Sequence, residues 1–149
     1  MVDFAFQIAI GSDHAGFHTK EFIKKSLAES GYQIRDFGTF SEASMDYPDT
    51  GHPVAKSVQS GEYRYGILVC GSGNGMAMTA NKYSGIRAAL CWNGEIASLA
   101  RRHNNANVIT LPARFISPEE AVDLCRIFLT TEFEGGRHQA RIDKISNLL

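Results

Sequence analysis

The stretch VCGSGNG, residues 69–75, holds the residues whose types and spacing most strongly suggest chemistry. Cys70 ends an apolar run, and three glycines follow within five residues. Glycines let a ligand approach the backbone, and the first amides of a helix have no intrahelical acceptor. Together with the helix dipole and the Ser72 hydroxyl, they could bind an oxyanion or a phosphate. The same field should favour the thiolate form of Cys70. On spacing alone, a tight turn with a buried, inert cysteine remains the alternative.

Three better-known phosphate-binding motifs do not fit this stretch. A dinucleotide fingerprint needs G-x-G-x-x-G after the first strand, whereas the spacing here is G-x-G-x-G after a later strand. A P-loop needs Gly-Lys-Ser/Thr, but Met76 follows Gly75. Met76 also stands where a cysteine-based phosphatase loop would have an arginine. The stretch therefore predicts an anion site of another kind.

A second candidate is the loop GSDHAG, residues 11–16, where Asp13 and His14 stand side by side. The two side chains could form an acid–base pair at a ligand site. Alternatively, Asp13 caps the following turn and His14 is solvated. The functional interpretation gains weight if this loop lies opposite the glycine-rich stretch.

Basic residues gather near the end of the chain. Arg137 and Arg141 are four residues apart, so they share one helix face. Two guanidinium groups on one face suit a phosphate dianion, and a solvated charged face is the alternative. His138 lies between them and is expected to be solvated.

Several other side chains have simpler explanations. His103 ends a predicted helix, where it could interact with the helix dipole. Arg101 and Arg102 are expected to be surface charges. Core or wall positions are expected for Met76, Met78, Cys91 and Cys125.

The elements that must position these residues alternate along the whole chain. Apolar runs predict strands at 4–10, 33–37, 65–70, 86–91 and 107–111. Helical spacing and capping residues predict helices at 20–30, 52–60, 76–83, 94–104, 117–131 and 140–149, with a loop at 38–52. This alternation predicts one α/β domain over residues 1–149, with helices on both faces of a parallel sheet. With strand one between strands two and three, the loops 11–16 and 70–75 flank one crevice.

Composition limits the kinds of partner. The net charge of −1 provides no overall basic field for nucleic acid. No apolar run approaches the roughly 20 residues that span a bilayer, and residues 1–10 do not resemble a signal peptide. The three cysteines are far apart and form neither a disulfide framework nor a zinc-type pair. We therefore expect a cytoplasmic protein that binds neither membranes nor nucleic acid.

Taken together, the motifs resemble those of the ribose-5-phosphate isomerase B family, which is grouped with galactose-6-phosphate and allose-6-phosphate isomerases. The matching segments are GSDHAG, MDYPD, CGSGNG, ANK, GIRAAL, RHNNANV and EGGRHQARI, in this order. The resemblance covers essentially the whole chain. It implies a Rossmann-like three-layer α/β/α sandwich with a five-stranded parallel sheet and a homodimer or dimer of dimers. It also implies a sugar-phosphate substrate and no metal or organic cofactor.

The resemblance also implies residue roles in interconverting ribose 5-phosphate and ribulose 5-phosphate, a step of the non-oxidative pentose phosphate pathway. Cys70 matches the general base, and Asp13 and His103 match the pair that opens the sugar ring. The loop that binds the enediolate oxygens matches Gly71, Ser72, Gly73, Asn74 and Gly75. The phosphate ligands match His14, Arg114, Arg137 and Arg141. Tyr47 matches a residue lining the sugar pocket, and Asn104 a sugar or enediolate contact.

One position departs from part of the family. A branch with the GSGNG spelling replaces the cysteine and places a glutamate base just after the last glycine. This chain has Met76 there and keeps Cys70, so Cys70 is favoured over Glu95, the next acid along the chain. A six-carbon sugar phosphate is the rival substrate. A non-catalytic phosphate-sensing module and a cysteine-dependent hydrolase are the rival classes.

His103 is expected to act in the active site of a partner subunit. The predicted helix at 94–104 starts near the carboxyl edge of the sheet and runs back. About ten residues at ~1.5 Å each carry His103 roughly 15 Å from its own crevice. A two-fold partner could still place it over the neighbour's Cys70 loop, as the family resemblance also implies.

Overall fold

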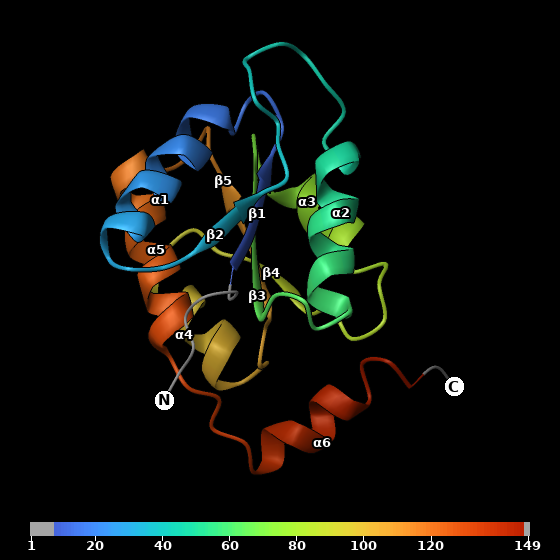
Figure 1. Cartoon of the computed structure of the whole chain (residues 1–149). Helices are drawn as coiled ribbons and strands as arrows, with labels where there is room; N and C mark the ends of the chain where they lie inside the picture. The colour runs from blue at the N-terminus through green and yellow to red at the C-terminus, as the bar shows by residue number, and fades with distance from the viewer. Residues whose placement is uncertain (1–7, 148–149) are drawn as a thin grey trace.

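The computed structural model describes residues 8–147, which form a five-stranded parallel sheet flanked by helices (Figure 1). The strands are β1 (Ile8–Ser12), β2 (Ile34–Asp36), β3 (Tyr65–Cys70), β4 (Ala88–Leu90) and β5 (Val108–Pro112). The helices are α1 (Phe17–Glu29), α2 (Pro48–Gln59), α3 (Asn74–Ala80), α4 (Gly94–Arg102), α5 (Pro118–Thr130) and α6 (Arg137–Asp143). The predicted α/β/α sandwich is thereby confirmed.

The strand order is β2-β1-β3-β5-β4, so the winding direction reverses between β1 and β3. These two strands are in register from Ile8 opposite Tyr65 to Ser12 opposite Val69. Their carboxyl ends therefore deliver the loops 11–16 and 70–75 to the same edge of the sheet. This is where open parallel sheets bind ligands, and it confirms the predicted arrangement of the two loops.

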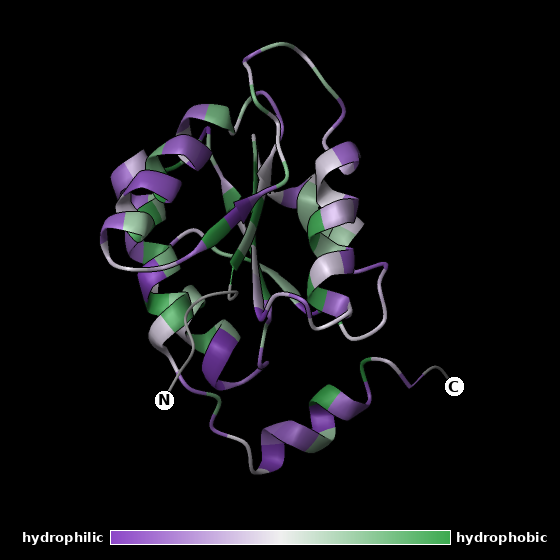
Figure 2. Ribbon diagram, in the orientation of Figure 1, coloured by the Kyte–Doolittle hydropathy of each residue, from purple (hydrophilic) through white to green (hydrophobic). Residues whose placement is uncertain are grey.

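Two apolar cores hold the layers together, one on each face of the sheet. Apolar residues of α1, α4 and α5 pack on one face, and those of α2 and α3 on the other. Hydrophobic colour accordingly follows the strands and the inner faces of these helices, whereas α6 is largely hydrophilic (Figure 2). No helix in residues 8–147 is long and apolar enough to cross a membrane.

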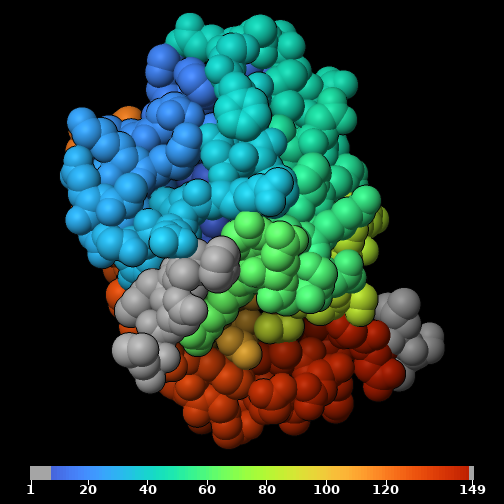
Figure 3. Space-filling view, in the orientation of Figure 1, coloured from blue at the N-terminus to red at the C-terminus, as the bar shows by residue number. Residues whose placement is uncertain are grey.

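The helix α6 lies apart from these layers, at the end of the molecule opposite the loop that leads into α2 (Figures 1 and 3). The sheet register explains why the segment beside α6 lies at this end of the molecule. Cys70, at the carboxyl end of β3, is opposite Pro112, whereas Gly66 is opposite Val108. The end of α4 precedes Val108 and therefore lies at the amino edge of the sheet, and α6 lies beside it.

The element boundaries differ from the prediction mainly at turns that contain proline or glycine. The helix predicted at 52–60 begins at Pro48, because proline suits the first helical position. The last helix covers 137–143 rather than 140–149, of which residues 148–149 lie outside the described range. Strand β1 extends to Ser12, and the predicted strand residues 4–7 also lie outside that range.

Two minor predictions are wrong. Arg101 is not a surface charge: it is 4% exposed and donates hydrogen bonds to the carbonyls of Thr131 and Ala106. Its guanidinium thereby satisfies one backbone acceptor between α4 and β5 and another at the end of α5. Met78 is 68% exposed rather than in the core, because the short helix α3 turns that face outward.

Candidate active site

A crevice of about 350 Å³ opens at the carboxyl ends of β1 and β3. It is lined by Asp13, Tyr47, Cys70, Gly71, Ser72, Gly75, Arg114 and Phe115. The two loops singled out in the sequence therefore meet in one site, together with Tyr47 from the start of α2 and Arg114 from the segment after β5. This crevice contains a thiol, a carboxylate, a hydroxyl and a guanidinium group.

Two positions of the glycine-rich turn favour glycine for steric reasons. Gly73 has φ +78°, and a Cβ atom there would lie 2.3 Å from Leu90 Cδ1. A Cβ atom on Gly75 would lie 2.5 Å from Cζ of Tyr47, so the Tyr47 ring rests directly on the turn. Ala77 N is the amide that bonds back to Gly73 O, so the amides before Ala77 have no carbonyl acceptor within α3.

Replacing Gly73 by alanine should destabilise the turn. The left-handed backbone and the contact with Leu90 should together cost about 1–3 kcal/mol, which lowers Tm by roughly 2–4 °C per kcal/mol. Gly61→Ala is the matched control, because Gly61 has φ +81° but no atom within 4 Å of its Cβ position. Thermal unfolding should show a clearly larger loss for Gly73→Ala. Equal losses of Tm in the two variants would mean that the contact with Leu90 does not lower the free energy of unfolding.

Asp13 is held in place by the turn that follows it. Its Oδ1 accepts a hydrogen bond from Gly16 N at 2.9 Å, and its own amide donates to Val69 O at 3.2 Å. The carboxylate is 7% exposed and lines the crevice. Both predicted interpretations therefore apply, since Asp13 caps the turn and also faces the site.

His14 lines an adjoining cavity of about 440 Å³ that shares Asp13 and Tyr47 with the crevice. Its Nδ1 accepts a hydrogen bond from Met45 N at 3.2 Å. The ring is thereby oriented by the loop leading into α2 and is not simply solvated.

The guanidinium group of Arg114 lies against the glycine-rich turn. Its Nη1 is 3.1 Å from the Cβ position of Gly71, and its amide donates to Gly71 O at 3.1 Å. A larger residue at position 71 would displace this cation. The cation at this edge of the crevice adds positive potential to that of the first amides of α3.

Cys70 differs from the other two cysteines in its surroundings. All three thiols are free and buried, but only Cys70 lines the crevice. Burial raises the pKa of Cys91 to about 12 and also raises that of Cys125, so both stay protonated in the core as predicted. Met76, where a branch of the family has glutamate, is fully buried and its sulfur lies 3.0 Å from the Cβ position of Gly51.

Gly73 and Asn74 belong to the turn but do not line the Cys70 crevice, and four other predicted site residues lie away from it. His103 and Asn104 follow α4, while Arg137 and Arg141 are exposed on α6, at the amino edge of the sheet. A strand of five residues at about 3.3 Å each separates the two edges, so one chain cannot bring both groups to one small molecule. This arrangement agrees with the separation that the sequence predicts between His103 and the crevice of its own chain.

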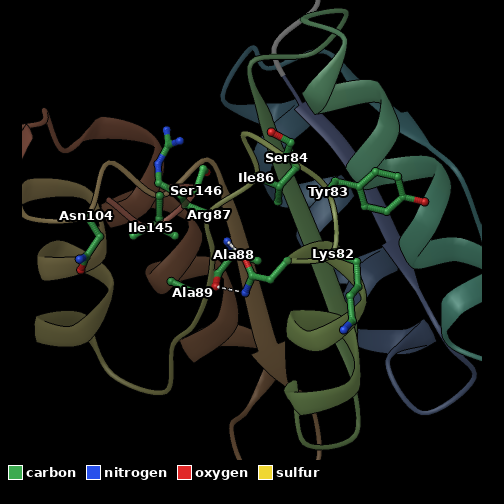
Figure 4. A pocket seen from close by; sticks show the side chains of 12 residues that line it. Lys82, Tyr83, Ser84, Ile86, Arg87, Ala88, Ala89, Asn104, Ile145 and Ser146 are labelled. Carbon is green, nitrogen blue, oxygen red and sulfur yellow. Dashed lines mark hydrogen bonds between the residues drawn. The ribbon is translucent and has the colours of Figure 1, made fainter. Parts of the chain in front are cut away.

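Asn104 instead lines the largest cavity described, of about 550 Å³ (Figure 4). This cavity lies between the segment joining α3 to β4 and the residues after α6, including Ile145 and Ser146. Asn81 closes one side by exchanging two hydrogen bonds with the backbone of Ala88. We place the active site in the smaller crevice, because that crevice contains the thiol, the carboxylate and the glycine-rich turn.

His138 is not solvated, contrary to the sequence-based prediction. It is 8% exposed, and its ring stacks on His103 with centroids 4.2 Å apart and planes inclined by 14°. Oε2 of Glu134 lies 3.5 Å from Nε2 of His138 and 3.9 Å from Nε2 of His103. Glu134 was not singled out from the sequence, although Glu134 and His138 are i,i+4 neighbours.

His103, Glu134 and His138 are close enough to be considered as metal ligands. An imidazole coordinates a metal in the plane of its ring, at about 2.0–2.1 Å for zinc. Two rings stacked nearly parallel cannot both direct a nitrogen lone pair at one ion. The arrangement fits a stacked pair better than a metal site.

A Rossmann-like sheet with a glycine-rich turn and a thiol at its winding reversal suits a sugar-phosphate isomerase, and the comparison with known families supports this class. The chain belongs to the ribose/galactose isomerase family, whose model matches residues 8–145.

Solved structures and curated relatives agree with this family. A ribose 5-phosphate isomerase of Thermotoga maritima is 50% identical, with TM-score 0.94 and coverage of 96% of this chain and 99% of that chain. The Mycoplasma genitalium ribose-5-phosphate isomerase B with bound ribulose-5-phosphate is 43% identical, with TM-score 0.91 and 95% of each chain covered. A D-erythrulose-4-phosphate isomerase of Pectobacterium atrosepticum is 40% identical over 93% of this chain and 91% of its own length.

Proposed function

We propose that the protein interconverts ribose 5-phosphate and ribulose 5-phosphate through an enediolate, with Cys70 as the general base. The observation that carries this proposal is the position of the Cys70 thiol, in one crevice with Asp13 and the glycine-rich turn. The names of the Thermotoga and Mycoplasma proteins support the five-carbon substrate. Family membership favours isomerisation over the sensor and hydrolase alternatives.

The reaction follows from the groups at the site. Asp13 and His103 transfer protons between the ring oxygen and the anomeric hydroxyl, and the cyclic sugar opens. The Cys70 thiolate then removes the proton from C2, next to the aldehyde carbon. Ser72 and the amides of the turn from Gly71 to Gly75 donate hydrogen bonds to the enediolate oxygens. A proton moves from O2 to O1, and the thiol returns the carbon-bound proton to C1, which yields the ketose.

This scheme needs two chains in each active site. Cys70, Asp13 and Arg114 come from one subunit, and His103, Asn104, Arg137 and Arg141 come from another. His14 and Arg114 approach the phosphate from the crevice, and the two arginines of α6 approach it from the partner. The proposed assembly is a homodimer, or a dimer of such dimers, with composite active sites in the cytoplasm.

Replacing Arg137 by alanine should weaken phosphate binding. A hydrogen bond to a charged group contributes about 1.5–3 kcal/mol, so KM for ribose 5-phosphate should rise roughly 10- to 100-fold. KM for unphosphorylated ribose should hardly change. Lys144→Ala, which removes an exposed cation just after the same helix, is the control. Equal changes in KM for both sugars would mean that Arg137 is a solvated surface charge and does not bind the phosphate.

A coupled assay across aldose phosphates tests the proposed substrate. The value of kcat/KM for ribose 5-phosphate should exceed the values for allose 6-phosphate and galactose 6-phosphate by at least about tenfold, a difference of about 1.4 kcal/mol. The reverse order would assign the chain to six-carbon substrates, which the family also includes. No turnover of any of these sugars would overturn the proposal.

A further inference from the structure

We propose that His138 is a positioning residue for His103. The His138 ring covers one face of the His103 imidazole, and the uncovered part of that imidazole stays accessible to the substrate. This inference rests on the proposed function, in which His103 transfers protons during ring opening. Neither the sequence motifs nor the family comparison assigns a role to His138.

The geometry of the pair fixes the orientation of His103. An imidazole on the surface can rotate about two side-chain bonds. Here α6 delivers His138 against His103 with centroids 4.2 Å apart, in a nearly parallel stack. The side chain of His138 is 10% exposed, whereas that of His103 is 36% exposed. The covered ring therefore supports the open one, as expected if the open ring does the chemistry.

Glu134 fixes the edge of the same stack. The carboxylate accepts a hydrogen bond from Nε of Arg102 at 2.7 Å and forms an ion pair with Nη2 of the same residue at 2.6 Å, and the Glu134 amide donates to Arg102 O at 3.0 Å. These contacts lower the pKa of Glu134, chiefly through the hydrogen bond from Arg102, so the group is ionised. Its Oε2 faces Nε2 of both imidazoles and places a negative charge at this edge of the stack.

The charges around His138 keep its ring neutral. Desolvation, His103 and the neighbouring Arg137 lower the pKa of His138, with a smaller contribution from Arg141, while Glu134 raises it. Acidification that protonates His138 would place a positive charge against the His103 ring and beside Arg137, which disfavours the stack.

Three variants test this role. His138→Ala removes the supporting ring, and a misplaced catalytic group typically costs up to about 10²-fold in rate. We expect kcat to fall roughly 10- to 100-fold, with KM for ribose 5-phosphate changed by less than about threefold. His138→Phe restores a flat ring and should recover most of kcat at pH 8. Gln139→Ala, an exposed neighbour on the same helix, is the control and should match the original protein.

The pH dependence separates positioning from simple packing. Phenylalanine cannot take up a proton, so the ratio of kcat for His138→Phe to kcat for the original protein should rise as pH falls from 8 to 5.5. Titrating groups that do not contact His138 are shared and cancel in this ratio. The measurement uses the Phe variant alone, so it holds even if His138→Ala does not fold. A ratio that stays constant or falls would overturn the inference, as would full kcat in a folded His138→Ala protein.

A parallel His103→Ala variant separates this inference from the proposed function. If His103→Ala is inactive while His138→Ala keeps full kcat, the positioning role of His138 is wrong and the proposed function is untouched. If His103→Ala keeps full activity, the catalytic role of His103 is wrong, and the stack has no catalytic group to position.

Discussion

Cys70→Ala is expected to lower kcat for ribose 5-phosphate by roughly 10²–10⁴-fold, the contribution of a well-placed general base. Substrate binding should persist, because the phosphate and sugar contacts come from other residues. Cys70 is the thiol that lines the crevice within residues 8–147, and position 76 offers no substitute, since Met76 is fully buried. Steady-state kinetics and ligand titration of the same preparation check the two parts of this prediction.

Cys91→Ala is the matched control for the loss of a thiol. Cys91 is fully buried on the other face of the sheet and lines no part of the crevice. Its replacement should change stability more than kcat. If Cys70→Ala kept more than a few per cent of the activity, Cys70 would not be the base. Glu95, exposed in the first turn of α4, would then be the next candidate.

Mixing two inactive variants should restore activity if the site is composite. Cys70→Ala and His103→Ala homodimers should each be nearly inactive, because every site lacks one group. After subunit exchange, each mixed dimer has one site with both native residues and one site with neither. Statistical mixing then gives about a quarter of the original activity.

A second mixture provides the control. Asp13 and Cys70 line the same crevice of one chain, so a Cys70→Ala and Asp13→Ala mixed dimer contains no intact site. This mixture should show no recovery. Native mass spectrometry verifies exchange in both cases. If the first mixture also failed to recover, His103 would act within its own subunit or have no catalytic role.

The fold was predictable because its signals are local. The apolar runs and glycine breaks fix the alternation of strands and helices, and the parallel sheet follows from that alternation. The prediction that residues at the carboxyl ends of β1 and β3 lie together, Asp13 with Cys70 among them, is therefore confirmed. Helix boundaries at Pro48 and Arg137 were displaced, because they depend on turn geometry that the periodicity does not record.

The environment of His138 could not be predicted, because it depends on where α6 packs. The pattern Arg137-His138-Arg141 reads as an exposed basic face, and the arginines are indeed exposed. His138 points the other way, onto a ring that comes from the end of α4. Such a contact between distant segments has no signature in local composition. The burial of Arg101 could not be predicted for a similar reason, since one of its acceptors, the Thr131 carbonyl, lies 30 residues further along the chain.

Isotope exchange in deuterated water tests the central claim most directly. A Cys70 thiolate that removes the C2 proton of ribose 5-phosphate and returns a proton to C1 should exchange that proton with solvent during prolonged turnover. Proton and carbon NMR should show ribulose 5-phosphate forming, with deuterium accumulating at C1 of the ketose and C2 of the aldose. Cys70→Ala should lose both the conversion and the exchange. Formation of ribulose 5-phosphate without any deuterium at equilibrium, or undiminished exchange in Cys70→Ala, would contradict a proton transfer through Cys70.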